Sequence, residues 1–183
     1  RPRAKCKRLN RLRTLRFDPR EGFFLNGRPL KVRGVSRHED WEGRGSALAA
    51  ADRERDVALI LEVGANAVRL AHYPHPEHFL ELCDRAGLLA WVEVPFVDSF
   101  MGGYADTPAF RENGQQQLRE MIRQGMNHPS VFLWGLYNEL TERGGRGPAQ
   151  LAYVKELQAL ARLDEADRLR SLQASVAGWV HER

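Results

Sequence analysis

The chain has 183 residues, of which 43% are hydrophobic and 28% charged, and it contains only two cysteines. These values are typical of a globular domain with a hydrophobic core, and they exclude an intrinsically disordered chain and a disulfide scaffold. No run of about 18 apolar residues is present to span a membrane, so we expect a soluble protein without a membrane partner. The compartment stays open, with a cytoplasmic location slightly favoured.

The positive charge is concentrated at the beginning of the chain. The formal net charge is +4, but residues 1–16 contain eight Lys or Arg and no acid, so the rest of the chain is net acidic. A basic segment can bind phosphates, yet this one has little aromatic interleaving and no nucleic-acid motif, and charge runs are usually solvated. We therefore divide the chain into a basic arm, 1–16, and one domain, 17–183, and expect no nucleic-acid partner.

Short apolar segments broken by turn signals come first after the arm. Asp18-Pro19 and Asn26-Gly27 interrupt the segment from Leu15 to Lys31, which predicts a hairpin of short strands. After it, apolar patterns typical of strands and of helices alternate. The predicted strands are 31–36, 66–71, 88–94, 130–137 and 172–176; the predicted helices are 46–63, one from about 76 that ends at Gly87, one capped by Thr107-Pro108, and 149–163.

Strands that alternate with helices pair in parallel, because each helix carries the chain back to the same end of the sheet. This leaves a doubly wound sheet or a (β/α)8 TIM barrel. Polar residues follow three of the strands, and in a barrel function gathers at the carboxyl ends of the strands. No Gly-rich phosphate fingerprint follows the first strand. We therefore predict an α/β fold, an incomplete TIM barrel with about the first five βα units, since a barrel has eight strands and about 250 residues.

The apolar segment that ends in WGLYNEL places an amide and a carboxylate at the tip of a predicted strand. An unpaired carboxylate is costly to bury, so the acid needs either solvent or a task. Glu139 is a candidate general acid/base in a cleft, next to Asn138, whose amide could hold a substrate hydroxyl. The alternative is a solvent-facing glutamate at the start of a loop, and position alone does not separate the two.

Histidines and an arginine lie at or near the ends of the neighbouring strands. His38 and His72 would hydrogen-bond a polyol, or each would be a structural histidine. Arg69 lies within its strand, where an ion pair with a strand-end carboxylate is the simplest expectation. His72, His75 and His78 are regularly spaced, but the run crosses from a strand into a helix and matches no standard zinc pattern, so we expect no metal site.

Three stretches together resemble the catalytic TIM barrel of glycoside hydrolase family 2, which includes β-galactosidases, β-glucuronidases and β-mannosidases. They are FFLNGRPLKVRGVSRHED at 23–40, GANAVRLAHYPHPEHFLELCDRAGLLAWVEVP at 64–95 and NHPSVFLWGLYNE at 127–139. They occur in the family's order and cover most of the chain after the arm. The resemblance implies a retaining β-glycosidase, β-galactosidase-like in the first instance, that hydrolyses terminal β-glycosides by double displacement.

The resemblance also implies roles for individual residues. Glu139 is the acid/base by this resemblance, and Asn138 contacts the sugar 2-hydroxyl. The family's nucleophile is a glutamate at the end of strand seven, for which the sequence offers no convincing counterpart, so we expect a fragment that is inactive alone. The residues that fall on the family's substrate-pocket segments are His38, Asp40, Arg69, His72 and Tyr73.

The implied partner is a β-linked carbohydrate, and no cofactor is required. Some β-galactosidases of the family hold Mg²⁺ near the acid/base, but the region VEVPFVDSF does not reproduce that pattern cleanly, so magnesium stays open. The strand edges of a partial barrel would favour a homo-oligomer. The alternative function is a non-catalytic carbohydrate-binding or interaction protein of the same fold, which would bind a sugar without hydrolysing it.

Overall fold

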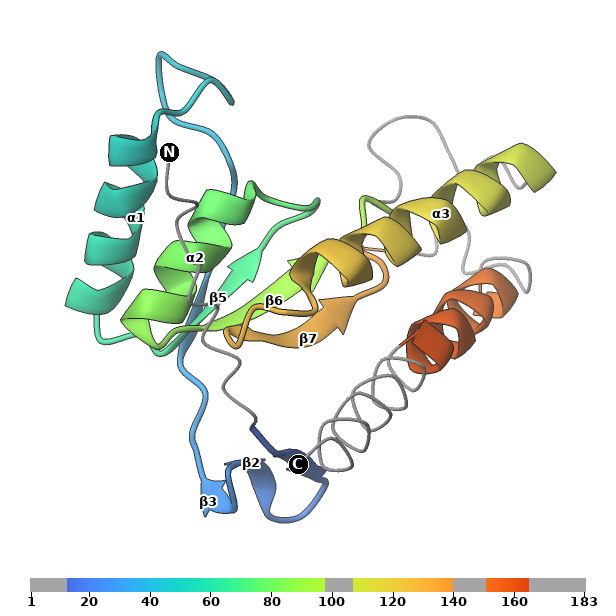
Figure 1. The fold of residues 1–183 in the computed structure, drawn as a ribbon, viewed down its shortest axis with the longest axis horizontal. Helices are drawn as coiled ribbons and strands as arrows, with labels where there is room; N and C mark the ends of the chain where they lie inside the picture. Colours follow the sequence, from blue (N-terminus) through green and yellow to red (C-terminus); the bar gives the residue numbers. More distant parts are fainter. Residues whose placement is uncertain (1–12, 98–106, 140–150, 165–183) are drawn as a thin grey trace, which may run out of the picture.

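A computed structural model describes residues 13–97, 107–139 and 151–164 of the chain (Figure 1). It begins with a small antiparallel sheet in the order β1 (Leu15–Asp18), β2 (Gly22–Leu25) and β3 (Arg28–Pro29). Asn26 and Gly27, with φ of 52° and 76°, form the two-residue turn between β2 and β3. Two left-handed residues are what such a tight hairpin turn requires. The predicted hairpin is confirmed.

The main sheet has four parallel strands. They are β4 (Gly34–Arg37), β5 (Ala67–Leu70), β6 (Leu89–Glu93) and β7 (Val131–Gly135), and each pairs with the next one along the chain. The crossovers contain α1 (Ala50–Glu62), α2 (Glu77–Ala86) and α3 (Pro108–Gly125), and residues 151–164 form a further helix. A doubly wound sheet would reverse its strand order at a switch point, so the sequential order is that of a TIM barrel. The predicted incomplete barrel is confirmed.

The boundaries of some elements differ from the prediction. Arg37 is the last residue of β4, although the sequence placed it after the strand. α1 starts at Ala50 rather than near 46. The carboxylate of Asp52 accepts a hydrogen bond of 2.8 Å from the amide of Ala49, so the helix is capped there. The predicted strand at 172–176 lies outside the described residues.

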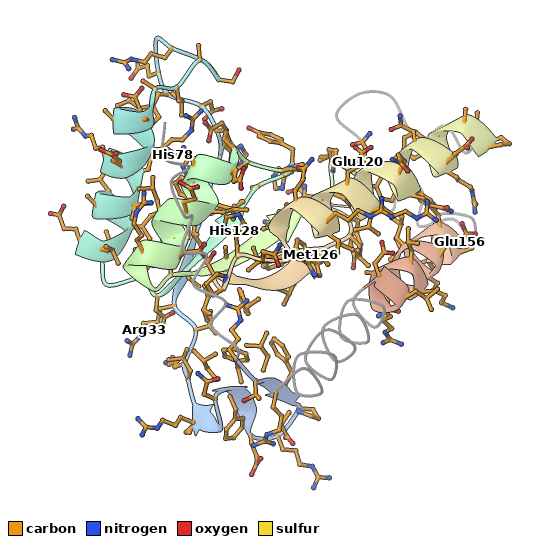
Figure 2. The ribbon with its side chains drawn as sticks, viewed as in Figure 1. Arg33, His78, Glu120, Met126, His128 and Glu156 are labelled. Atoms are coloured by element: carbon orange, nitrogen blue, oxygen red, sulfur yellow. The ribbon has the colours of Figure 1, made fainter. Side chains whose placement is uncertain are left out.

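The helices pack on one face of the main sheet. The larger hydrophobic cluster joins them to strand side chains such as Leu70, and Phe79 and Ile122 are completely buried in it. The helix at 151–164 packs beside α3, and its Glu156 forms an ion pair of 2.7 Å with Arg111 (Figure 2). None of the helices in the described part of the chain combines the length and apolar character needed to cross a membrane.

The small hairpin sheet packs at the amino-terminal ends of the main strands. A second hydrophobic cluster joins Phe23 of β2 to Ala67 and Leu89, which are the first residues of β5 and β6. Burial of these side chains fixes the hairpin against that end of the barrel segment. The hairpin therefore leaves the carboxyl ends of the strands uncovered, which is the side where barrel enzymes hold their active sites.

Gly125 lies where the end of α3 packs on β7. A Cβ at this position would approach the indole ring of Trp134 to 2.8 Å, closer than carbon atoms pack. We therefore expect Gly125→Ala to lower the free energy of unfolding by about 1–3 kcal/mol through overpacking, although alanine favours helices. Thermal unfolding measures the change, and exposed Gln124→Ala on the same helix is the matched control. A more stable Gly125→Ala variant would contradict this packing.

Candidate active site

Four polar side chains meet at the carboxyl ends of β5, β6 and β7. Arg69 Nε donates to Glu93 Oε1 at 2.7 Å, and Arg69 Nη2 donates to Asn138 Oδ1 at 2.7 Å. His72 Nδ1 lies 2.8 Å from Glu93 Oε2. We call Arg69, His72, Glu93 and Asn138 the strand-end cluster. Because Glu93 is only 1% exposed, its charge is buried, whereas the side chains of Arg69 and His72 are 27% and 22% exposed.

The pleat of the sheet brings these side chains together. Arg69 of β5 is in register with Trp91 of β6, and its guanidinium lies 5.0 Å from the centre of the indole ring. Residues two apart along a strand share a face, so Glu93 points to the same side as Trp91. The backbone N–H of Asn138 donates to the backbone carbonyl of Phe96 at 2.9 Å, which fixes the segment after β7 beside the segment after β6. The strand-end ion pair expected for Arg69 is confirmed.

The other predicted site residues lie around this cluster. The ring of His38 stands edge-on to the imidazole of the cluster, with 5.0 Å between the centroids. The hydroxyl of Tyr73 accepts a hydrogen bond of 3.2 Å from the amide of Glu39, which ties the segment after β5 to the segment after β4. Asp40 and Glu139 are exposed. The structure thus groups the histidines, the arginine and the asparagine, and leaves both of these carboxylates facing solvent.

Glu139 has an unusual backbone conformation. It follows Asn138 directly, and its φ of 47° lies in the left-handed region. A side chain with a Cβ adopts that region at a cost of about 1–2 kcal/mol, and such residues cluster at functional sites. The strained backbone at Glu139 thus holds an exposed carboxylate immediately after Asn138 of the strand-end cluster. This combination favours the functional interpretation of Glu139 over that of an ordinary loop residue.

A second buried ionic cluster lies between β4 and α1. Arg37 Nε donates to Asp56 Oδ2 at 2.8 Å, and Arg37 Nη1 contacts both Glu39 and His75. Arg53 Nε donates to Glu39 Oε1 at 2.6 Å. Burial alone would raise the pKa of Glu39, but its hydrogen bonds from the two arginines outweigh burial and hold the pKa below its usual value. Glu39 therefore anchors the segment that carries His38 and Asp40.

His75 gives this second cluster a dependence on pH. Burial lowers the pKa of His75 to about 4. The unfolded chain binds a proton below about pH 6.5 but the folded chain does not, so stability is lost as the pH falls from about 6.5 to 4. His75→Gln is expected to reduce the loss of unfolding free energy between pH 7.5 and 5.5 by about 1.4 kcal/mol. Urea unfolding at both pH values measures this, and equal losses in variant and wild type would contradict it.

Two histidines of the run already have protein partners in the structure. His72 is engaged by Glu93, and His75 contacts an arginine and a backbone carbonyl. In the part of the chain that the structure describes, no group of three or more His, Cys, Asp or Glu is placed to hold a metal ion. Magnesium stays open as in the sequence analysis. Both oxygens of Glu93 serve protein partners, and Asp98 of the region VEVPFVDSF lies outside the described residues.

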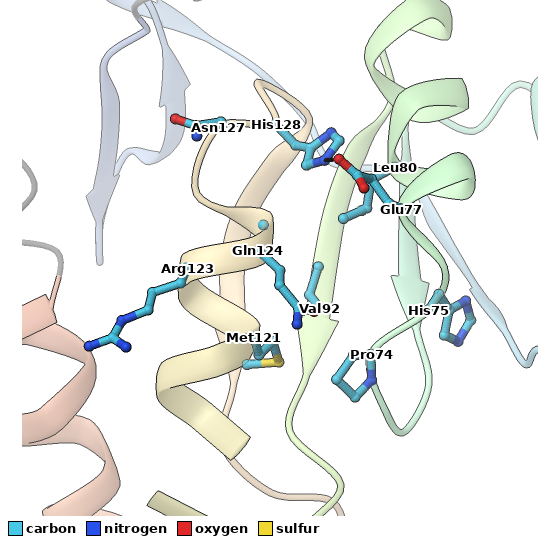
Figure 3. A pocket seen from close by; sticks show the side chains of 11 residues that line it. Pro74, His75, Glu77, Leu80, Val92, Met121, Arg123, Gln124, Asn127 and His128 are labelled. Atoms are coloured by element: carbon cyan, nitrogen blue, oxygen red, sulfur yellow. Dashed lines mark ion pairs between the residues drawn. The ribbon is translucent and has the colours of Figure 1, made fainter. Parts of the chain in front are cut away.

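A pocket of about 240 Å³ lies between α2 and α3, on the helix side of the sheet (Figure 3). Its apolar lining includes Leu80, Val92 and Met121, and His128 at its rim lies 4.0 Å from Glu77. The pocket shares no residue with the strand-end cluster. It is therefore separate from the candidate active site.

Known proteins match the part of the chain that contains the candidate active site. The family model described as glycosyl hydrolases family 2, TIM barrel domain, matches residues 19–175. The chain belongs to glycoside hydrolase family 2. A β-glucuronidase of Bacteroides fragilis is 49% identical over 162 residues, which are 86% of this chain and 23% of that protein. A β-galactosidase of Thermoanaerobacterium thermosulfurigenes is 40% identical over 121 residues, 66% of this chain and 16% of that protein.

A solved structure agrees with the family 2 fold. Bacteroides uniformis β-glucuronidase 2, covalently bound to cyclophellitol-6-carboxylate aziridine, matches with a TM-score of 0.76 and 40% identity over 84% of this chain and 19% of that one. The resemblance found in the sequence is confirmed at the level of family and barrel. The chain spans less than a quarter of the length of these relatives.

Glu93 is the member of the strand-end cluster that sequence reasoning missed. A signal was present, because Glu93 lies within the apolar run LLAWVEV, where an unpaired carboxylate would be costly. The expectation that Arg69 pairs with a strand-end carboxylate pointed toward it without naming it. Only the register between β5 and β6 shows that the two side chains share a face.

Proposed function

We propose that Glu139 is the acid/base of a retaining β-glycosidase and that this chain supplies that part of the active site in the whole protein. The observation that carries the proposal is the position of Asn138-Glu139 at the carboxyl end of a barrel strand, where Arg69 joins Asn138 to the buried Glu93. The covalent adduct of the Bacteroides uniformis relative supports a retaining mechanism, which passes through a covalent intermediate.

The reaction takes place in two displacements. Protonated Glu139 donates its proton to the glycosidic oxygen as the bond to the anomeric carbon breaks, while a second carboxylate bonds to that carbon. Glu139, now ionised, accepts a proton from water, which attacks the anomeric carbon and frees the sugar and the second carboxylate. Glu93 is an unsuitable nucleophile because both of its oxygens are engaged, so we assign the second carboxylate to a residue outside the described ones.

The sugar lies over the strand-end cluster in this proposal. Asn138 holds the 2-hydroxyl next to the scissile bond, and the exposed His38 stands against the cluster on the side of β4. A hydroxyl-rich substrate suits such a set of donors and acceptors on rigid strand ends. The proposed pocket residues are His38, Asp40, Arg69, His72 and Tyr73.

β-Glucuronides are the first substrates to test. The Bacteroides fragilis relative at 49% identity is a β-glucuronidase, and so is the Bacteroides uniformis protein of the matching structure. The β-galactosidase relative is 40% identical over a shorter stretch. These identities support testing β-glucuronides before β-galactosides, which the sequence analysis put first.

The test uses the whole protein and nitrophenyl β-glucuronide, β-galactoside and β-mannoside. We expect hydrolysis of at least one of them, with the β-anomer of the sugar formed first, as recorded by proton NMR before mutarotation. An α-anomer as first product would contradict a retaining mechanism. Sugar binding without hydrolysis would favour the non-catalytic carbohydrate-binding alternative.

A further inference from the structure

The carboxylate of Glu93 is buried and is held by two protein partners. It is 1% exposed, its Oε1 accepts from Arg69 Nε at 2.7 Å, and its Oε2 lies 2.8 Å from His72 Nδ1. Arg69 Nη2, which only donates, also lies 3.2 Å from His72 Nδ1, but the contact with Glu93 is shorter. An ionised carboxylate only accepts hydrogen bonds, so His72 carries its Nδ1 proton toward Glu93. The tautomer of His72 follows from this contact, and Nε2 is the nitrogen left for other partners.

The neighbouring strand keeps space for this carboxylate. A Cβ at Gly135 of β7 would lie 2.7 Å from Glu93 Cγ and closer still to the indole nitrogen of Trp91. Both distances are far inside van der Waals contact, so only glycine fits beside the Glu93 side chain. Glu93 is thus enclosed by packing as well as by charge.

The consequence for Asn138 is a fixed orientation of its carboxamide. Arg69 is held at Nε by Glu93 and presents Nη2 to Asn138 Oδ1 at 2.7 Å. Because the amide oxygen is occupied, the two protons on Asn138 Nδ2 remain as donors for a substrate. Rotation of the carboxamide by half a turn would place its NH₂ group against the guanidinium, which also only donates.

We propose that Glu93 is a positioning residue that fixes the orientation of Asn138 through Arg69 and the tautomer of His72, so that both present set donors or acceptors to the sugar. The inference rests on the function proposed above. It assigns no chemistry to Glu93 itself, because the side chain is buried and both of its oxygens have protein partners.

Glu93→Gln in the whole protein tests the proposal. Glutamine keeps the size but places an NH₂ group against either Arg69 or His72. We expect kcat toward a hydrolysed nitrophenyl β-glycoside to fall about 10–100-fold, because misplacement by about 1 Å at a reacting centre has that effect. KM should change less than kcat, since contacts to a sugar hydroxyl next to the reacting carbon strengthen in the transition state.

A combined variant separates positioning from a structural role. Because Glu93 acts through both Asn138 and His72, adding Glu93→Gln to an Asn138→Ala/His72→Ala background should change kcat/KM by less than about threefold, since residues that act as a unit are not additive. Multiplied effects, or an unchanged kcat in Glu93→Gln, would overturn the proposal. Glu120→Gln, an exposed change on α3, is the matched control for kcat.

Crystal structures of the wild type and Glu93→Gln give a readout that does not depend on turnover. We expect the Asn138 carboxamide to leave its contact with Arg69 in the variant. An unmoved carboxamide would overturn the positioning role even if the wild type hydrolysed none of the glycosides. Failure of hydrolysis by the wild type would instead overturn the proposed function, so the two failures are distinguishable.

Discussion

Replacing Glu139 by glutamine is expected to lower kcat of the whole protein toward an unactivated β-glycoside by about 10²–10⁴-fold. This is the usual contribution of a positioned general acid/base, and glutamine cannot give or take the proton. Substrate binding should change little, because the amide keeps the shape of the carboxyl group. Steady-state kinetics with an alkyl β-glycoside measure the effect.

The leaving group provides the diagnostic comparison for this variant. A dinitrophenolate departs without protonation, so the first displacement should be much less impaired with a dinitrophenyl β-glycoside than with the alkyl one. Exposed Glu62→Gln on α1 is the matched control and should leave both substrates unaffected. Equal losses for both substrates would indicate that Glu139 has some role other than acid catalysis.

Removing Arg69 is expected to produce the largest loss of stability. Arg69→Met keeps much of the apolar stem but leaves Glu93, which is 1% exposed, without its guanidinium partner. Breaking a buried ion pair from one side typically costs about 3–5 kcal/mol, and the partial exposure of the Arg69 side chain places the expectation near the lower value, about 3 kcal/mol. Urea unfolding at neutral pH measures the change.

An exposed ion pair supplies the control for Arg69. Arg85 and Glu81 on α2 approach to 3.8 Å, with side chains 60% and 50% exposed. Arg85→Met is expected to change the unfolding free energy by less than about 1 kcal/mol, because solvent screens such pairs. Similar losses in the two variants would contradict the view that the strand-end cluster is a buried ionic unit.

Local sequence signals predicted much of the fold. Turn chemistry identified the Asn26-Gly27 hairpin, and the caps expected at Thr107 and Gly87 occur where α3 starts and α2 ends. These features depend on neighbouring residues, so a sequence displays them directly. The alternation of strands and helices then predicted a parallel sheet with sequential order.

Features that depend on contacts between distant elements were harder to predict from the sequence. The start of α1 follows from the cap at Asp52. Arg37 was misplaced because its backbone pairs with Leu70 of β5, which extends β4 by one residue beyond the predicted strand. The role of Glu93 depends on the register between neighbouring strands, which fixes the face that each side chain shares with the next strand. Glu139 could be selected as a candidate from its position at a strand end, but its left-handed backbone conformation could not be predicted from the sequence.

Azide tests most directly whether Glu139 is the acid/base of a retaining site. In a Glu139→Ala variant, azide can enter the space left by the carboxyl group and attack the covalent glycosyl intermediate on the face opposite the nucleophile. With a dinitrophenyl β-glycoside we predict that azide raises the turnover rate and that NMR identifies a β-glycosyl azide as product. An α-glycosyl azide would make Glu139 the nucleophile, and absence of any azide product would contradict its role as the acid/base.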